Sequence, residues 1–570
     1  HTSSNGRSAS QVGSINGAGQ VVGSSARYNG TASAGQSAWL YSQGEMQFLG
    51  LTGPEYTYSN GYAYSIGGQL NEAGQVIGYT HRNTGTSSSG WSAWLYSEGA
   101  TQQIGLTGAG YTNTGNGYAH SVAQRLNEAG QVIGYSTRYD GTASAGQAAW
   151  LYAGGLTQQI GLTGGDHTHA GNGSANSTAH MLNEAGQVIG SSARYNGTAN
   201  AGQSAWLHSQ GETRQIGLTG DGFTGSGGYA YSTARALNDA GQVTGYSASF
   251  AGGVGTGNVA WLYSDGATQR IGLTGAGYTN TITGRSSSQS QSINGAGQVI
   301  GSSERYTEGA GTGQAAWIYS QGVTQRIGLT GEGYEATGNI NPGYASSTAY
   351  SINEAGQVVG SSKLFTPGAE SQSVWIYSQG ATRQIGLTGD SFVSVSGRSY
   401  SEVLSLNEAG QVIGYSRRDT GQVAWFFDDV SDQTYALEFS VSASHGSSYS
   451  NASYLGEDGL VLGSFDAYED AVLLGRRAFA WTMEGGMQDL GLLVAGGLDA
   501  DWASLANAYR GNASGQIIGT GRLVSNGDQG VFLLTPVPEP EGWAMLLAGL
   551  GLTAHVSARR RRQSNPVPSA

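Results

Sequence analysis

The acidic residues that could do chemistry gather in one region of this sequence. Nine carboxylates lie between positions 428 and 470: Asp428, Asp429, Asp432, Glu438, Glu457, Asp458, Asp466, Glu469 and Asp470. Clustered carboxylates can bind Ca²⁺ or serve as the acid and base of glycan cleavage. The same pattern also fits solvated charge on a diverged repeat, which is the interpretation that we favour.

No other set of side chains forms a recognisable catalytic or metal-binding pattern. His167 and His169 make a His-Thr-His pair, but no carboxylate or third ligand accompanies them at metal-site spacing. Cysteine is absent, which excludes disulfides, thiolate metal sites and a cysteine nucleophile within this chain. Gly-x-Ser-x-Gly elbows, phosphate-binding loops and His-Glu-x-x-His helices are also missing. We therefore expect no enzymatic activity, no cofactor and no bound metal.

The charge of the chain excludes one class of partner. The formal net charge is −13, and four of the 25 basic residues form the run Arg559, Arg560, Arg561 and Arg562. Setting that run aside leaves 21 basic against 38 acidic residues. A body with this excess of negative charge repels the phosphate backbone, so we expect no nucleic-acid partner.

A segment of the type Leu-Asn-Glu-Ala-Gly-Gln-Val-Ile-Gly recurs along the chain. Its glutamine marks eight copies at intervals of 54 to 59 residues: Gln20, Gln75, Gln131, Gln187, Gln242, Gln298, Gln357 and Gln411. Two weaker copies at 457–464 and 512–520 bring the number of units to ten, and the unit at about 428–491 is diverged. A period of this length is typical of propellers, solenoids and arrays.

Each unit predicts four short strands. In residues 121–164 these are "SVAQRLN", "QVIGYSTRY", "AAWLY" and "TQQIGL". Alternation within the third strand places Trp150 and Tyr152 on one face and two smaller apolar residues on the other, so both faces are buried. We therefore predict an all-β fold over residues 1–535. It is a β-propeller of about ten four-stranded repeats of about 55 residues, with a β-solenoid as the alternative.

The turn between the first and second strands has its own signature. Asn127 can cap it with its side chain, the next two residues suit its central positions, and Gly130 supplies a positive φ. We expect Glu128 to lie on a solvated turn rather than to act as a catalytic acid. The reason is that Gly17 and Gly295 replace it in two units.

Long polar loops follow the fourth strand of each unit. Examples are 109–121 and 165–177, which vary in sequence and are rich in Tyr, Asn, Ser and Thr. If the units align, these loops gather on one rim, where they could bind sugars or could be flexible without a ligand. Arginines recur after the second strand and are expected to pair locally or to cover apolar surface: Arg27, Arg138, Arg194 and Arg305.

One unit carries a resemblance to a known repeat family. The stretch "RAFAWTMEGGMQDLGLL", residues 477–493, resembles the extracellular repeats named for their His-Ala-Phe (HAF) motif. The residues that carry it are Ala478, Phe479, Trp481, Met487, Asp489, Leu490 and Gly491. Most other units have Ser-Ala-Trp or Ala-Ala-Trp in place of His-Ala-Phe. The resemblance implies an exported repeat protein.

Three segments follow the repeats: a Pro-rich linker at 536–541, an apolar stretch at 542–558 and a basic tail at 559–570. We expect the apolar stretch to form a transmembrane helix. Its 15 residues before Ser557 reach about 22 Å, short of a hydrocarbon core of roughly 30 Å, so the helix must tilt or use flanking residues. The arginines would stay cytoplasmic and leave the repeats outside. A peripheral or buried helix is the alternative.

The same segments resemble the bacterial sorting signal called PEP-CTERM. Its three parts are present in order: Pro538, Glu539 and Pro540, then the apolar helix, then Arg559 to Arg562. Two departures are His555 within the apolar run and the eight residues that follow the arginines. The resemblance implies processing by an exosortase of a Gram-negative bacterium after transient anchoring in the inner membrane. Delivery to the cell surface or to an exopolysaccharide matrix would follow.

These observations predict a non-catalytic exported protein of the cell surface, biofilm or extracellular matrix, with extracellular polysaccharide as an expected partner. One alternative is a lectin-like propeller that recognises glycans through the rim loops. A second is a polysaccharide hydrolase or lyase that uses Asp466 and Asp470.

Overall fold

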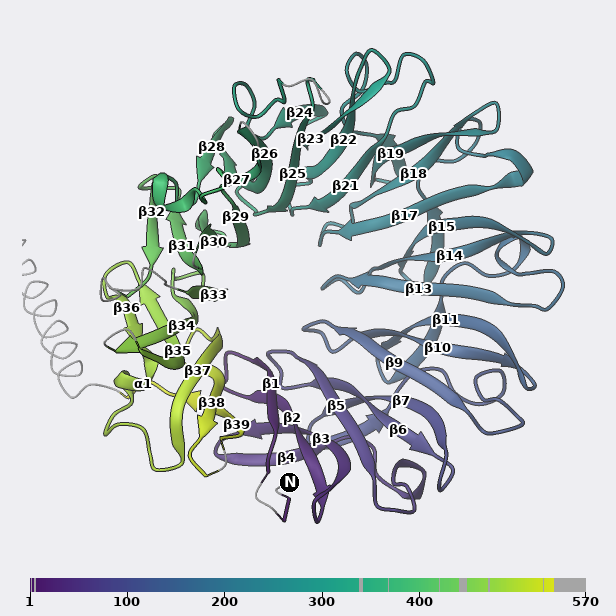
Figure 1. The fold of residues 1–570 in the computed structure, drawn as a ribbon. Coiled ribbons are helices and arrows are strands. Elements are labelled where there is room, and N and C mark those ends of the chain that lie inside the picture. The colour runs from purple at the N-terminus through teal and green to yellow at the C-terminus, as the bar shows by residue number, and fades with distance from the viewer. Residues whose placement is uncertain are drawn as a thin grey trace, which may run out of the picture.

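The computed structural model describes residues 1–537 except 2, 5–6, 338–341, 367–368, 420, 440–448, 470–471 and 526. Within these residues the chain forms 39 strands, four short 3₁₀ helices and one four-residue α-helix. Figure 1 shows the strands grouped into small sheets that follow one another around a centre. The prediction of an all-β fold is therefore confirmed, and the arrangement is propeller-like.

The strands of the first five units have the following bounds: β1 (Ser10–Ile15), β2 (Val21–Asn29), β3 (Ala32–Ser42), β4 (Glu45–Leu49); β5 (Ala63–Leu70), β6 (Val76–Asn83), β7 (Ser88–Ser97), β8 (Ala100–Gln103); β9 (Ala119–Leu126), β10 (Val132–Asp140), β11 (Ala143–Ala153), β12 (Leu156–Ile160); β13 (Ala175–Leu182), β14 (Val188–Asn196), β15 (Ala199–Ser209), β16 (Glu212–Ile216); β17 (Ala230–Leu237), β18 (Val243–Ala251), β19 (Val254–Ser264), β20 (Ala267–Arg270). Three of the 3₁₀ helices lie in the loops here: Pro54–Tyr56, Gly165–His167 and Ser226–Gly228.

The remaining units have these bounds: β21 (Ser288–Ile293), β22 (Val299–Thr307), β23 (Ala310–Ser320), β24 (Val323–Ile327); β25 (Ala345–Ile352), β26 (Val358–Thr366), β27 (Ala369–Ser378), β28 (Ala381–Ile385); β29 (Ser401–Leu406), β30 (Gln411–Arg418), β31 (Gly421–Asp428), β32 (Gln433–Leu437); β33 (Ser450–Leu455), β34 (Val461–Glu469), β35 (Val472–Thr482), β36 (Gly486–Asp489); β37 (Trp502–Gly511), β38 (Ile517–Leu523), β39 (Gln529–Leu534). The fourth 3₁₀ helix is Asp390–Phe392, and α1 (Leu490–Leu493) follows β36.

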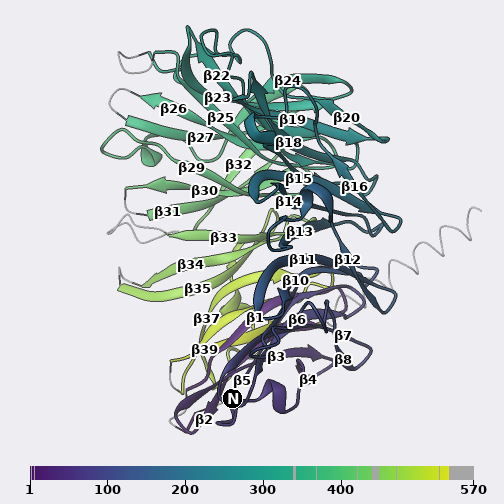
Figure 2. The same ribbon diagram turned by 90° about the vertical axis from the view of Figure 1, so that its right-hand side faces the viewer.

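Within a unit the strands form an antiparallel meander. In unit three, β10 pairs with β9 on one side and with β11 on the other, and β11 pairs with β12. Neighbouring units are also linked through a short parallel pairing between the third strand of one unit and the first strand of the next, as between β7 and β9. Figure 2 shows consecutive sheets lying one above another from β26 to β35.

A glycine and a tryptophan set the spacing inside each sheet. Gly134 on β10 lies opposite Trp150 on β11. A Cβ atom at Gly134 would lie 2.1 Å from the carbonyl oxygen of Val122 and 2.4 Å from Cζ2 of Trp150. Only glycine therefore lets the indole ring lie across the middle strand. The tryptophans at this position are almost fully buried in seven units: Trp94, Trp150, Trp206, Trp261, Trp317, Trp375 and Trp425.

The hydrophobic core lies between the sheets rather than within any one of them. One cluster joins Ile77, Leu95 and Ile104 of unit two to Val132 and Trp150 of unit three. Equivalent clusters follow at the later interfaces. Each sheet therefore buries both faces against its neighbours, which confirms the stacking predicted from the apolar third strand.

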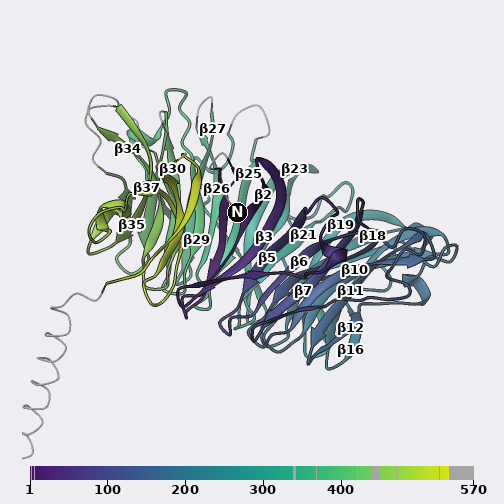
Figure 3. The same cartoon turned by 90° about the horizontal axis from the view of Figure 1, so that it is seen from below.

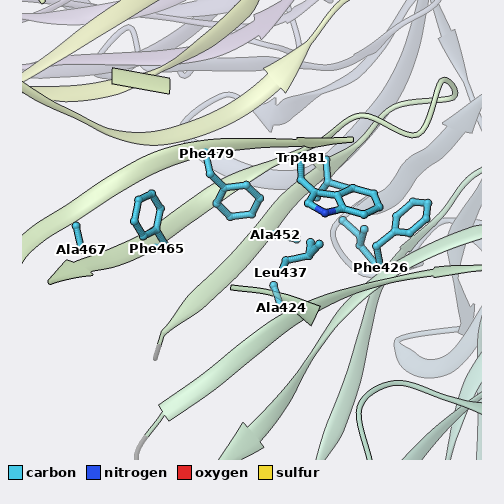
Figure 4. Packing of buried hydrophobic residues seen from close by; sticks show 10 residues of the cluster. Ala424, Phe426, Leu437, Ala452, Phe465, Ala467, Phe479 and Trp481 are labelled. Atoms are coloured by element: carbon cyan, nitrogen blue, oxygen red, sulfur yellow. The ribbon is translucent and has the colours of Figure 1, made fainter. Parts of the chain in front are cut away.

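The interface between units eight and nine uses a different set of aromatic residues. Phe479 takes the place of the tryptophan, and the rings of Phe426 and Trp481 lie with centroids 4.5 Å apart. Figure 4 shows these side chains between the two sheets, together with Leu437 and Phe465. The diverged unit therefore keeps the stacking principle while changing the residues.

The first and last described units are in contact. Val21 and Trp39 of unit one pack against Ile518 of unit ten, and the Asn512 side chain donates a hydrogen bond of 2.9 Å to the Asn16 carbonyl. Figure 1 shows β1 beside β38 and β39. Seen from below in Figure 3, the strands of units eight to ten stand at a different inclination from those of units two to five.

The predicted membrane and sorting segments fall beyond this description. Among the described residues, no helix has the length and apolar character needed to cross a bilayer. The expected transmembrane helix at 542–558 and the basic tail at 559–570 lie outside them, as do Pro538, Glu539, Pro540 and the arginines at 559–562.

Candidate binding site between units two and three

The repeated turns link each unit to the next. In unit three, the Asn127 Oδ1 accepts a hydrogen bond from the Gln131 backbone N–H at 2.8 Å, and Gly130 has a φ of 76°. The predicted capped turn is thus confirmed. The Asn127 side-chain amide also donates to the Asn183 carbonyl of unit four at 3.0 Å, so the cap ties two units together.

The glutamate of the turn has a structural role that the sequence did not reveal. The Glu128 carboxylate accepts the backbone N–H of Glu72 in the preceding unit at 2.8 Å. The Glu128 N–H in turn donates to Glu184 at 2.9 Å. The expectation of a merely solvated turn residue was therefore incomplete. Where Gly17 and Gly295 replace the glutamate, that carboxylate link to the preceding unit cannot form.

Two carboxylates of the 428–470 region, Glu438 and Asp466, line one cavity between units eight and nine, and the other described ones do not line it. Asp429 and Asp432 pair with Arg383, and Glu438 pairs with Arg418 at 2.9 Å. Four more have separate local partners: Asp428 with Ser431, Glu457 with the Glu408 N–H, Asp458 with the Leu460 N–H, and Asp466 with Arg476. The Glu469 side chain forms no hydrogen bond or ion pair with the described residues. Asp470 lies outside the described residues. Seven of the nine carboxylates therefore have a polar partner within the described part of the chain.

Histidines also lie apart from any metal-type cluster. The His167 ring hydrogen-bonds Ser204, and the His169 Nδ1 accepts the backbone N–H groups of Gly171 and Asn172. Within the part of the chain that the structure describes, no three His, Asp or Glu side chains are placed to hold a metal ion.

Loops after the fourth strand are anchored rather than free. In unit two, the Tyr111 N–H bonds the Gly108 carbonyl at 3.0 Å, and the Tyr111 hydroxyl donates to Gln159 of unit three at 2.7 Å. Burial raises the pKa of the Tyr111 hydroxyl. The same three-residue step from glycine to an aromatic or histidine recurs at Tyr56, His167, Phe223, Tyr278, Tyr334 and Phe392. Sequence reasoning missed this signal, although the spacing is constant.

A pocket with a volume of about 360 Å³ lies on the loop side between units two and three. Unit two supplies one wall and its own loop, and the start of β9 in unit three supplies the other wall. The residues that line it are Arg82, Trp91, Ser92, Gln103, Gly105, Leu106, Thr107, Gly108, Thr112, Ala119, His120 and Ser121. None of them is acidic, and the set combines one large aromatic ring with several hydrogen-bonding groups.

Trp91 is the large aromatic residue among those that line this pocket, and the β6–β7 register puts its side chain on the face of His81, opposite the face of Arg82 and Ser92. It is half-buried, and its ring packs against His81 at 4.4 Å and Tyr79 at 5.1 Å between centroids. Tyr64 meets it edge-on at 5.7 Å, and β7 pairs Trp91 directly with His120 of β9. The ring is therefore held in a fixed orientation at the junction of the two units.

Trp91 is an exception to the repeat. The equivalent register position in six other units is a glutamine: Gln36, Gln147, Gln203, Gln314, Gln372 and Gln422. Trp91 thus lies outside the repeated core position, which Trp94 fills in the same strand. An alignment of "GWSAWLY" with "GQSAWLY" could have found it from the sequence.

Arg82 supplies the positive charge of the pocket. One terminal nitrogen lies 3.5 Å from the Ser92 hydroxyl, and the buried Nε atom has no hydrogen-bond partner among the described residues. Burial lowers the pKa of His81 and of His120. Both rings therefore favour the neutral form at neutral pH, where they act as hydrogen-bonding groups rather than as cations.

A smaller pocket of about 210 Å³ occupies the equivalent place between units four and five. Arg194, Gln203, Ser204 and Gln215 stand where the first pocket has Arg82, Trp91, Ser92 and Gln103. A further cavity of about 240 Å³ lies at units eight and nine, where Arg477 pairs with Asp489 at 3.0 Å. Aromatic residues line all three cavities, but the arginines of the other two are paired with carboxylates, whereas Arg82 forms no ion pair among the described residues.

Two family profiles match parts of this chain. A family of unknown function, DUF7453, matches residues 182–436, and the PEP-CTERM protein-sorting motif matches residues 536–562. The second match confirms the sorting motif predicted from the sequence, and this motif indicates export and processing by an exosortase. No curated protein shows significant sequence similarity to the chain.

Solved structures with similar folds are distant. A puromycin hydrolase mutant complexed with PGG matches with a TM-score of 0.30 and 10% identity, over 73% of this chain and 61% of that one. The β-propeller domain of the Trilobed protease from Pyrococcus furiosus matches with a TM-score of 0.27 and 9% identity, over 66% and 95%. An oligogalacturonate lyase in complex with manganese gives 0.26 and 11%, over 64% and 91%. The chain thus spans about three fifths of the hydrolase, and no activity is transferred from similarities at this level.

Proposed function

We propose that this chain is an exported, non-catalytic protein of the cell surface or extracellular matrix that binds an extracellular polysaccharide. The pocket at Trp91 is the observation that carries the proposal. A sugar ring presents C–H groups on one face and hydroxyls around its edge. A lining that includes an aromatic residue and amide, hydroxyl and guanidinium groups offers partners for both.

The position of the pocket suits a long ligand. It opens at the junction of two units and is bordered by the loop of unit two. A polysaccharide can therefore enter one pocket while its neighbouring sugars contact the adjoining loops, and weak contacts along one polymer add up through effective concentration.

The proposed assembly is a closed propeller of ten units. It is supported by the packing of Ile518 against Val21 and Trp39, and by the Asn512 hydrogen bond to Asn16, which repeats the link seen between consecutive units. We also propose that the units belong to the His-Ala-Phe class. Unit nine keeps Ala478 and Phe479 as buried residues of β35.

Processing follows from the sorting motif. In this proposal residues 542–558 hold the precursor in the inner membrane until an exosortase removes them, and the repeats then reach the surface. Mass spectrometry of the mature C-terminus in hosts with and without the exosortase tests this step. A tail that stays intact in both hosts would refute it.

An array of neutral and acidic oligosaccharides, probed with the full chain and with Trp91→Gln, tests the binding function. Glutamine is the residue of six other units at this position, so the variant should fold normally. We expect at least tenfold weaker binding, since an aromatic contact contributes about 1 kcal/mol beyond the area that it buries. Binding that does not change would place the ligand elsewhere. Turnover of any bound glycan by the chain would contradict a non-catalytic role.

A further inference from the structure

The arginine that several units carry near the end of the second strand has a different electrostatic setting in different parts of the molecule. Arg194 pairs with Asp166 at 3.0 Å, Arg305 with Glu335 at 3.5 Å and Arg418 with Glu438 at 2.9 Å. In these units a carboxylate of the protein already neutralises the guanidinium.

Arg82 has no such partner. Among the described residues it forms no ion pair, and none of the residues that line its pocket carries a negative charge. In the loop that precedes unit two, Glu55 occupies the position equivalent to Asp166, which pairs with Arg194. The Glu55 carboxylate, however, lies against Gly53. This half-buried cation, in a body with a net charge of −13, lacks the carboxylate partner that Arg194, Arg305 and Arg418 have.

From this setting we infer that the pocket between units two and three binds a sugar that carries a carboxylate, namely a uronic acid of an acidic polysaccharide. The inference rests on the proposed function and names its substrate class. The Arg82 guanidinium receives the carboxylate, for which its planar fork of N–H donors is suited, and Ser92 lies beside it on the same face of the sheet. Trp91, on the opposite face of β7, contacts another sugar of the same polymer.

The neighbouring units favour a polymer over a single sugar. Arg27 and Arg138 hold the position of Arg82 in units one and three, and neither forms an ion pair within the described part of the chain. An acidic chain that lies across these units therefore meets positive charge on both sides of the pocket, although the protein as a whole is acidic.

The test uses matched pairs of hexasaccharides: oligoglucuronate, oligomannuronate and oligogalacturonate, each beside its carboxyl-reduced neutral form. Binding to the full chain is measured by calorimetry at low and at high salt. We expect at least one acid to bind about tenfold to hundredfold more tightly than its reduced form, with a ratio that shrinks as salt rises.

Three variants separate this inference from the proposed function. Arg82→Gln should lower the ratio of acid to neutral affinity below about twofold while weak neutral binding persists, and Trp91→Gln should weaken both forms. Arg194→Gln is the matched control, because its guanidinium is already paired, and it should leave the ratio unchanged. Equal affinity for acid and neutral forms, sensitive to Trp91 but not to Arg82, would overturn the inference and leave the proposed function standing. Absence of binding to every oligosaccharide would overturn both.

Discussion

The pocket between units two and three and the pocket between units four and five share one backbone frame. In each, an arginine of the second strand lies 3.5 Å from a serine of the third strand: Arg82 with Ser92, and Arg194 with Ser204. Each is completed by the loop of its own unit and the start of the next unit. The repeated fold therefore holds the geometry of both pockets constant.

Their contents differ at several points, which include His120 in place of Tyr231 and the loop residue Phe223 that lines only the second pocket. Two further differences bear directly on the proposed ligand. Trp91 replaces the glutamine that Gln203 represents, and Arg194 is paired with Asp166 whereas Arg82 is not. The comparison teaches that a repeat scaffold can create a specific site through very few substitutions, because the neighbouring groups are already in place.

The largest expected effect separates the scaffold from the pocket. Trp94 and Trp91 lie on the same strand, but Trp94 is fully buried and Trp91 is half-buried. Trp94→Ala should lower the free energy of unfolding by about 3–5 kcal/mol through the cavity that it leaves. Trp91→Gln should cost less than about 1 kcal/mol. Urea denaturation of both variants measures the difference, and equal losses would show that Trp91 belongs to the core.

The links between units should be nearly as sensitive as the core. Asn127 is 4% exposed and its side chain makes three hydrogen bonds, one of them to unit four. Asn127→Ala should cost about 2–3 kcal/mol, because buried partners are left unpaired. Glu128→Ala removes only an exposed hydrogen bond from Glu72 and should cost less than about 1 kcal/mol. A larger loss of unfolding free energy for Glu128→Ala than for Asn127→Ala would contradict the assignment of Asn127 as the stronger link between units.

Converting one pocket into the other sharpens the comparison. The double variant Gln203→Trp and Asp166→Asn gives the pocket of units four and five the tryptophan and the unpaired arginine of the other. We expect it to restore uronate binding in a Trp91→Gln background, with a gain of about 1–2 kcal/mol over that background. Calorimetry reports the outcome. A chain that still fails to bind would mean that further residues distinguish the two pockets.

The smallest effect concerns pH. Burial lowers the pKa of His120, so the unfolded chain binds more protons than the folded one below the ordinary histidine pKa of about 6.5. The stability from the neutral ring is present above that pH and is lost as the pH falls towards the folded pKa. Thermal unfolding between pH 7.5 and pH 5 should show this loss. His120→Tyr, which copies Tyr231 of the other pocket, should lose less.

Burial also lowers the pKa of His81, His167, His180 and His208, so the variant should reduce the dependence on pH rather than abolish it. A chain that becomes more stable as the pH falls would contradict the assigned neutral state of these rings.

The fold was largely predictable because its signals are local and repeated. The alternation in "AAWLY" indicated strands that are buried on both faces, and the Asn-Glu-Ala-Gly turn indicated its own geometry. Contacts between units were harder to predict from the sequence, because they depend on how the sheets stack. The partner of Glu128, for example, is about 56 residues away. For the same reason, the closeness of Asp429 and Asp466 in the sequence wrongly suggested that they share one site. Asp429 pairs with Arg383 of β28, whereas Asp466 pairs with Arg476 of β35.

Only part of the candidate site could be predicted from the sequence. Arg138 and Arg194 stood out as recurring residues, but only the structure shows that Asp166 neutralises one of them. Trp91 was visible as a departure from a glutamine position, and its meaning depended on the pocket that β7 and β9 form together.

A structure of the full chain with a bound uronate hexasaccharide tests the central claim most directly. We expect a uronate carboxylate about 3 Å from the Arg82 guanidinium and a sugar of the same chain in contact with Trp91. A hexasaccharide that binds at the loops of other units and leaves Trp91 uncovered would contradict the claim.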